Sequence, residues 1–89
     1  MSRPPVKKHE AFNETTIDGE IVVLNLADGA FFSLTGTAAA IWTLIDGARD
    51  RASILDELVY RYGEDRNLIA PDLDAFLAEL AGAGFLADA

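Results

Sequence analysis

Residues 22–42 read Val-Val-Leu-Asn-Leu-Ala-Asp-Gly-Ala-Phe-Phe-Ser-Leu-Thr-Gly-Thr-Ala-Ala-Ala-Ile-Trp. Every second residue from 22 to 26 is apolar, and the alternation continues from 30 to 34, which predicts two strands joined by a tight turn. Apolar residues at helical spacing follow the second strand and predict an amphipathic helix. We expect the rest of the chain to cover one side of this unit.

Two registers are open for the hairpin. A loop of residues 27–29 pairs Leu26 with Ala30 and suits a type I turn whose glycine takes the left-handed conformation. A loop of residues 28–29 pairs Leu26 with Phe31 instead. We favour the three-residue loop because it keeps one face uniformly apolar, and a slip by one residue exchanges the two faces. The face expected on the core then carries Val22, Leu24, Leu26, Ala30, Phe32 and Leu34.

The opposite face of the hairpin is also apolar, since it carries Ile21, Val23 and Phe31. Three helices in so small a protein can cover only one side of the sheet. An apolar second face beside an unpaired strand edge is a place where an extended peptide could add itself.

A further strand is predicted from Phe12 to Ile17, and the Asp18-Gly19 pair that follows it is a strong signal for a hairpin. Together with the strands at 20–26 and 30–34, it forms a three-stranded antiparallel meander.

Three helices are predicted after the sheet. The first is expected to start at Thr35 and stop at Gly47, and the second to start at Asp50 or Ser53 and stop at Gly63. The third is expected to start at Pro71 and to be closed by Gly82 and Gly84. Trp42 shares a helical face with Ala38 and Ile45, so we assign it to the core. Three strands followed by three helices predict an α+β domain of winged helix-turn-helix type.

The composition indicates one small domain without disulfides, since the chain has 89 residues and no cysteine. An apolar run of about 20 residues, as a membrane span requires, does not occur. Residues 1–9 are basic and contain two prolines, so we expect a mobile tail there and the folded domain at 10–89. No apolar segment of a secretory signal follows the basic start, and a cytoplasmic protein is the default expectation.

The net charge of the chain is -8, and three of its seven basic residues lie in the first eight positions. The remaining domain is therefore strongly acidic. A phosphate backbone would be repelled, because nucleic-acid affinity depends largely on lysine and arginine. The charge favours peptides or proteins as partners.

Side chains with catalytic potential are few. The single histidine, His9, lies in the basic tail, and the carboxylates show no spacing typical of a metal site. A glycine pair near the C-terminus follows a helix instead of opening one, so it is no phosphate loop. We predict no enzymatic activity, no cofactor and no metal.

Several short patterns occur in order along the chain: Val23-Leu24-Asn25-Leu26, Gly29-Ala30-Phe31-Phe32, Ile41-Trp42, Asp46-Gly47, Phe76-Leu77 and Gly84-Phe85-Leu86. Each is weakly specific by itself, but the ordered set is fairly specific. Between Phe12 and Leu86 the chain resembles the PqqD-like family, the peptide-recognition elements of pathways that modify ribosomally made peptides.

The resemblance implies a non-catalytic module that holds the leader segment of a precursor peptide and presents it to a modifying enzyme. That enzyme would be a radical SAM enzyme in pyrroloquinoline quinone synthesis, or a leader peptidase in lasso-peptide or similar maturation. In such proteins the leader adds antiparallel to the third strand, with side chains in a groove against the last helix. The peptide-binding residues carried over are Phe31, Phe32, Ser33, Leu34, Asp72, Ala75, Phe76, Glu79 and Ala83.

Two other functions compete with this one. A winged-helix DNA-binding regulator fits the helix order, but the predicted third helix contains no Lys or Arg. A structural dimer could form by joining two third strands edge to edge, so monomer and edge-paired dimer both remain open. Asp72, Asp74 and Glu79 have a simple alternative explanation too, as the solvated acidic side of a helix.

Overall fold

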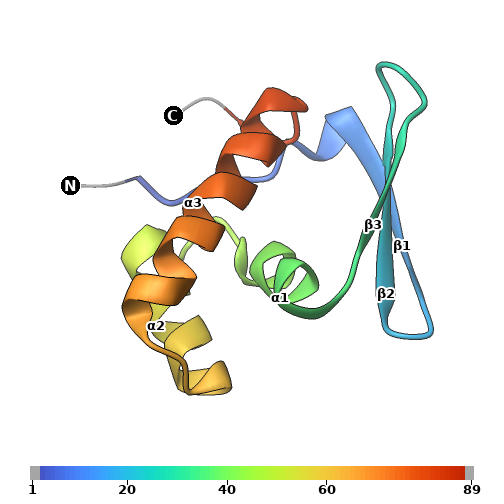
Figure 1. Cartoon of the computed structure of the whole chain (residues 1–89). Coiled ribbons are helices and arrows are strands. Elements are labelled where there is room, and N and C mark those ends of the chain that lie inside the picture. The colour runs from blue at the N-terminus through green and yellow to red at the C-terminus, as the bar shows by residue number, and fades with distance from the viewer. Residues whose placement is uncertain (1–2, 88–89) are drawn as a thin grey trace.

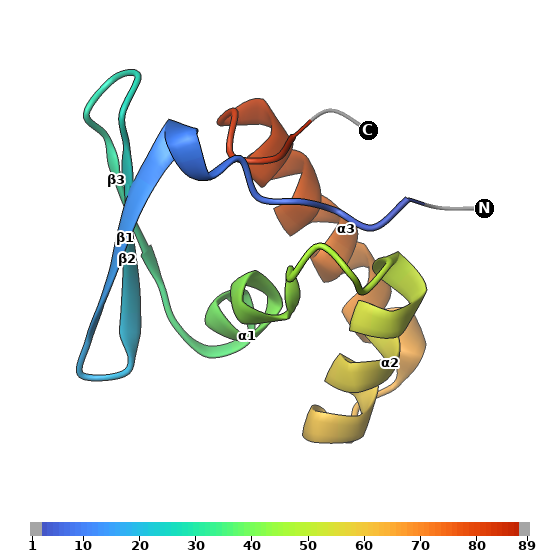
Figure 2. The ribbon, with the colours of Figure 1, turned by 180° about the vertical axis from the view of Figure 1, so that it is seen from behind.

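The computed structural model describes residues 3–87. Its elements follow the predicted order of three antiparallel strands and three helices, so the α+β fold class is confirmed (Figure 1). The elements are η1 (His9–Ala11), β1 (Phe12–Ile17), β2 (Glu20–Asn25), β3 (Phe31–Leu34), α1 (Gly36–Leu44), α2 (Arg51–Tyr62) and α3 (Arg66–Gly82). The three helices lie on one side of the sheet in both views (Figures 1 and 2).

The first hairpin has the predicted turn. Ile17 pairs with Glu20, and the two residues between them have positive φ angles, 51° at Asp18 and 82° at Gly19. Positive φ at both central positions is the type I′ geometry, whose twist matches that of the strands. The Asp18-Gly19 prediction is confirmed.

The register of the second hairpin differs from both predicted registers. Val23 pairs with Phe32, and Ile21 pairs with Leu34. The backbone N–H of Asn25 donates to the carbonyl of Ala30 at 2.8 Å, which leaves a four-residue loop. The predicted loops of three and two residues are both wrong, and β2 presents its other face to the core.

Asn25 explains the error. It is buried on the core side, where its Oδ1 accepts from the Ala27 N–H at 2.9 Å and its Nδ2 donates to the Ala83 carbonyl at 3.4 Å. A buried amide is tolerated when its polar atoms are bonded in this way. Because this inward position is polar, the apolar alternation of β2 indicated the wrong face. Leu26, predicted to lie in the core, is 49% exposed.

The first two helices keep most of their predicted starts and ends. Asp50 caps α2, because its Oδ1 accepts from the Ser53 N–H at 2.9 Å, and this decides between the two predicted caps. Gly63 ends α2 in the left-handed conformation. Helix α1 begins after Thr35 and ends at Leu44, before the predicted stop at Gly47.

The start of α3 is a correction. The helix begins at Arg66, capped by the Asp65 carboxylate, which accepts from the Asn67 N–H at 2.9 Å. Pro71 lies inside the helix, where it leaves the Asn67 carbonyl without its usual i+4 donor. The helix was predicted to start at Pro71, so its observed start at Arg66 is five residues earlier. Asp74 then lies too far along to meet the helix N-terminus and binds Arg51 instead.

The core joins the sheet to the helices through aromatic side chains. Trp42 is 1% exposed, which confirms its assignment to the core. The ring of Phe85, from the segment after α3, makes edge-to-face contacts with Phe12 at 5.5 Å and with Phe32 at 5.4 Å between centroids. Such contacts fix ring orientation as well as burying area.

The N-terminal segment runs back across the helices to the C-terminal segment (Figure 2). Lys8 N–H donates to the Phe85 carbonyl at 2.7 Å, and Ala87 N–H donates to the Val6 carbonyl at 2.8 Å. The predicted mobile tail, residues 1–9, is therefore hydrogen-bonded to the domain in its second half. Residues 1–2 of that tail and 88–89 of the predicted domain lie outside the described residues.

Over residues 3–87, none of the helices combines the length and the hydrophobicity that crossing a bilayer would demand.

Candidate functional site

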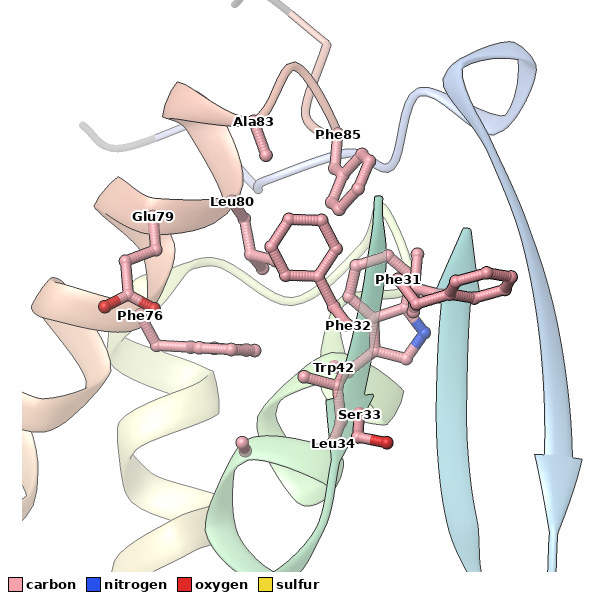
Figure 3. Close-up of a pocket in the computed structure, with 12 residues that line it drawn as sticks. Phe31, Phe32, Ser33, Leu34, Trp42, Phe76, Glu79, Leu80, Ala83 and Phe85 are labelled. Atoms are coloured by element: carbon pink, nitrogen blue, oxygen red, sulfur yellow. The ribbon is translucent and has the colours of Figure 1, made fainter. Parts of the chain in front are cut away.

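A groove of about 420 Å³ lies between β3 and α3 (Figure 3). We call it the β3–α3 groove. The lining consists mainly of apolar side chains from the sheet, α1, α3 and the C-terminal segment. It comprises Val23, Phe31, Phe32, Ser33, Leu34, Ala38, Trp42, Phe76, Glu79, Leu80, Ala83 and Phe85.

Strand β3 forms one side of the groove and is also an edge of the sheet, whose order is β1-β2-β3. Hydrogen-bonded pairs alternate along an antiparallel ladder. Because Asn25 bonds to Ala30, the next bonded residues of β3 are Phe32 and Leu34. The N–H and C=O groups of Phe31 and Ser33 therefore point to the open side, where they can pair with an added strand.

The two adjacent phenylalanines of β3 take opposite sides. Phe32 points into the groove toward Phe85 and is 39% exposed, whereas Phe31 points away from the groove and is 71% exposed (Figure 3). The side chains of a strand alternate between faces, so one of the pair had to leave the core.

The base of the groove is rigidly held. The indole N–H of Trp42 donates to the Glu14 carboxylate at 3.0 Å, and the ammonium of Lys7 lies 4.3 Å from the centre of its ring. Partial burial lowers the pKa of Lys7, while Glu14 and Asp46 act in the opposite direction. A cation over an indole face is attracted by the ring quadrupole. These contacts place Trp42 before any ligand arrives.

Helix α3 forms the other side of the groove. Phe76, Glu79 and Ala83 follow one another at helical spacing, and Figure 3 shows Phe76 reaching from α3 toward β3. The small Ala83 leaves room at one end, and Glu79 supplies a carboxylate at the solvent side. No Lys or Arg is part of the lining. The groove thus suits an apolar segment with a neutral or basic neighbour.

Most cations of the domain are engaged elsewhere. Arg51 binds the Asp74 carboxylate, and this pairing raises the pKa of Arg51 and lowers that of Asp74. Arg66 donates to Asp56 on α2, and Arg49 and Arg61 bind acids close to them in sequence. Among residues 3–87, no three His, Cys, Asp or Glu side chains gather into a possible metal site.

Seven of the nine predicted site residues border the groove: Phe31, Phe32, Ser33, Leu34, Phe76, Glu79 and Ala83. Of these, Phe31 lies at the rim of the groove with its ring turned to the other face of the sheet (Figure 3). Asp72 lies on a separate small depression with Thr37, Tyr62 and Glu64. Ala75 is exposed and lines neither. Asp72 was carried over from the family resemblance and shares helical spacing with Phe76, but it does not line the groove.

Prediction missed the base of the groove. The sequence assigns Trp42 to the core, and it gives Phe85 only as part of the Gly84-Phe85-Leu86 pattern. The one usable signal was the position of Phe85 directly after Gly84, where the last helix has ended. An aromatic ring at such a position, if buried, packs against residues distant in sequence. Phe85 is 1% exposed and is part of both the core and the groove.

Residues 20–86 match the family model described as "Coenzyme PQQ synthesis protein D (PqqD)". A "PqqA binding protein" of Rhodopseudomonas palustris (strain TIE-1) is 40% identical over 99% of this chain and 84% of its own length. The protein of the same name from strain HaA2 is 38% identical over 100% and 85%.

A solved structure shows the same fold. It is described as "TbiB1 in Complex with the TbiA(beta) Leader Peptide", with a TM-score of 0.78 and 33% sequence identity. The match covers 89% of this chain and 95% of that one.

Proposed function

The chain belongs to the PqqD family, and from this and the β3–α3 groove we propose that it binds the leader segment of a ribosomally made precursor peptide. It acts as a non-catalytic adaptor that presents this peptide to a modifying enzyme. The observation that carries the proposal is an open strand edge directly beside an apolar groove.

The peptide binds as a fourth strand, antiparallel to β3. The exposed backbone groups of Phe31 and Ser33 supply affinity that depends little on the peptide's sequence. Peptide side chains opposite Phe32 and Leu34 point into the groove, where Phe76 and Phe85 contact them. Apolar burial there selects the peptide.

Two kinds of relative support this proposal. The curated relatives are named for binding PqqA, and the structural neighbour is described in complex with a leader peptide. For this chain we propose either a PqqA-like precursor with a radical SAM enzyme, or a lasso-type leader with a leader peptidase. Identification of the genes adjacent to its own tests the choice, since a radical enzyme beside a short precursor favours the first and a protease subunit favours the second.

The DNA-binding alternative is opposed by the charge of α3. Helix α3 carries one basic residue, Arg66, and its guanidinium is bound to Asp56. A DNA-recognition helix needs cations free to contact phosphates and bases. Pairing of two β3 edges would use the same backbone groups as the peptide, so peptide binding and such a dimer would exclude each other.

Trp42 allows a direct test, because it is the only tryptophan and lies at the base of the groove. The chain is titrated with the short precursor encoded beside its gene, by calorimetry and by tryptophan fluorescence. We expect a one-to-one complex and a change in Trp42 emission that follow the same isotherm. Absence of both heat and emission change at high micromolar peptide would refute the proposed function.

A further inference from the structure

The sheet has a second exposed surface, which the groove does not use. We call it the outer face, and it is the side turned away from the helices (Figures 1 and 2). Strand alternation assigns to it the apolar residues Ile17, Val22, Leu24 and Phe31. Phe31 is its most exposed large apolar member, at 71%.

Phe31 is also the apolar outer-face residue of β3, the strand at the open edge. On β2 its partner is Leu24, which is partly buried. On its other side β3 pairs with no strand of residues 3–87, so any strand added there places a side chain next to Phe31. Facing residues of an antiparallel pair lie on the same side of the sheet.

An added peptide strand therefore meets β3 with both of its faces. If residue k of the peptide lies opposite Phe32, residue k enters the groove. Residue k+1 then lies opposite Phe31 and residue k−1 opposite Ser33, both on the outer face. Backbone bonds alone do not fix this register, because a shift by two residues preserves every bond and every face.

The two outer positions differ in chemistry. Phe31 and Leu24 form an apolar surface, whereas the hydroxyl of Ser33 donates to the Glu20 carboxylate. An apolar side chain is favoured beside the first and a polar or basic one beside the second. This asymmetry can distinguish one register from the next.

We propose that Phe31 is a specificity-determining residue that fixes the register of the bound peptide by selecting an apolar side chain at position k+1. The inference rests on the proposed function, since it requires a peptide strand on β3. It adds a selection on the outer face to the one made by the groove.

A random dodecapeptide display library is selected on the chain and on two variants. Phe31→Thr removes the apolar ring and keeps a residue that favours strands. Ile17→Thr is the matched control, because Ile17 is an exposed outer-face residue on β1, the edge strand opposite β3. We expect apolar residues at k and k+1 with the wild type and Ile17→Thr, and at k alone with Phe31→Thr.

The selected peptides are then made with Ser at k+1. We expect the affinity of the wild type to fall about 2- to 5-fold, and that of Phe31→Thr to change less than about 1.5-fold, from the size of cross-strand pair energies. Equal losses of affinity in both proteins, or selection by the wild type at k without any at k+1, would overturn this inference and leave the proposed function intact. If the peptides bound the Ser33→Pro variant with the same affinity as the wild type, both the inference and the proposed function would be overturned.

Discussion

The two sides of the β3–α3 groove differ in the groups that they present to a peptide. Strand β3 presents backbone groups at Phe31 and Ser33, which bind any extended chain. Where it borders the groove, helix α3 has its backbone groups bonded within the helix, so it can contribute only side chains, with Phe76 the largest. Affinity and selectivity are thus divided between two elements, and substitutions on each should fail in different ways.

The largest effect is expected from Ser33→Pro, which removes one edge donor and places a ring where the peptide backbone must approach. The β2–β3 ladder should survive, because the Ser33 N–H points to the open side. We expect the affinity for the precursor to fall about 100-fold or more. Calorimetry measures the affinity, and circular dichroism checks the fold.

Ser33→Thr is the control for that variant, since it keeps the N–H and the hydroxyl. It should bind like the wild type. Tight binding by a folded Ser33→Pro protein would show that strand addition to β3 is not the source of affinity.

On the helix side, Phe76→Asp should weaken every apolar leader about 30-fold, or ~2 kcal/mol, by placing a carboxylate in a groove that a ligand desolvates. Ala75→Asp adds the same charge one residue away, where the side chain is exposed outside the groove. It should change affinity little. Equal losses in the two variants would indicate long-range charge repulsion instead of a contact.

A smaller loss of peptide affinity is expected from substitution of Lys8, whose backbone bond positions Phe85 at the base of the groove. Lys8→Pro removes the N–H that donates to the Phe85 carbonyl, whereas Lys8→Ala keeps it. The lost bond should cost about 0.5–1.5 kcal/mol of folding stability. Looser placement of Phe85 should also reduce peptide affinity about 3-fold. Denaturation and titration of both variants test this, and identical behaviour of the two would mean that the N-terminal segment does not position Phe85.

The smallest effect on binding is expected at Asp74, which faces Arg51 away from the groove. The side-chain hydrogen bond from Arg51 holds the pKa of Asp74 below its ordinary value of 3.8. Its contribution to stability is therefore present above that value and is lost as the pH falls through the lowered pKa. Asp74→Asn should bind peptide normally and lose less stability than the wild type on acidification. Chemical denaturation between pH 6 and about pH 2.5 checks this, and parallel curves would contradict it.

Local signals predicted most of the fold. The Asp18-Gly19 turn, the cap at Asp50 (one of two predicted candidates) and the apolar face with Trp42 are each set by residues close in sequence. These features need no knowledge of the tertiary structure, which is why they could be predicted.

Two of the failures have a different cause. Asn25 is buried because the carbonyl of Ala83, distant in sequence, accepts its amide. Phe85 reaches the groove through pairing of the two terminal segments. Both depend on partners that alternation and spacing do not reveal, and so the register and the base of the groove escaped prediction. The start of α3 was missed although its signal is local, because Pro71 was taken as the first helical residue and the cap at Asp65 was overlooked.

Amide hydrogen exchange by NMR, with and without the precursor, tests the central claim most directly. Phe32 and Leu34 bond to β2 in the free protein, whereas Phe31 and Ser33 face the open edge. We predict that the peptide slows exchange at Phe31 and Ser33 strongly and leaves the alternating neighbours nearly unchanged. Binding without new protection at Phe31 and Ser33 would contradict strand addition to β3.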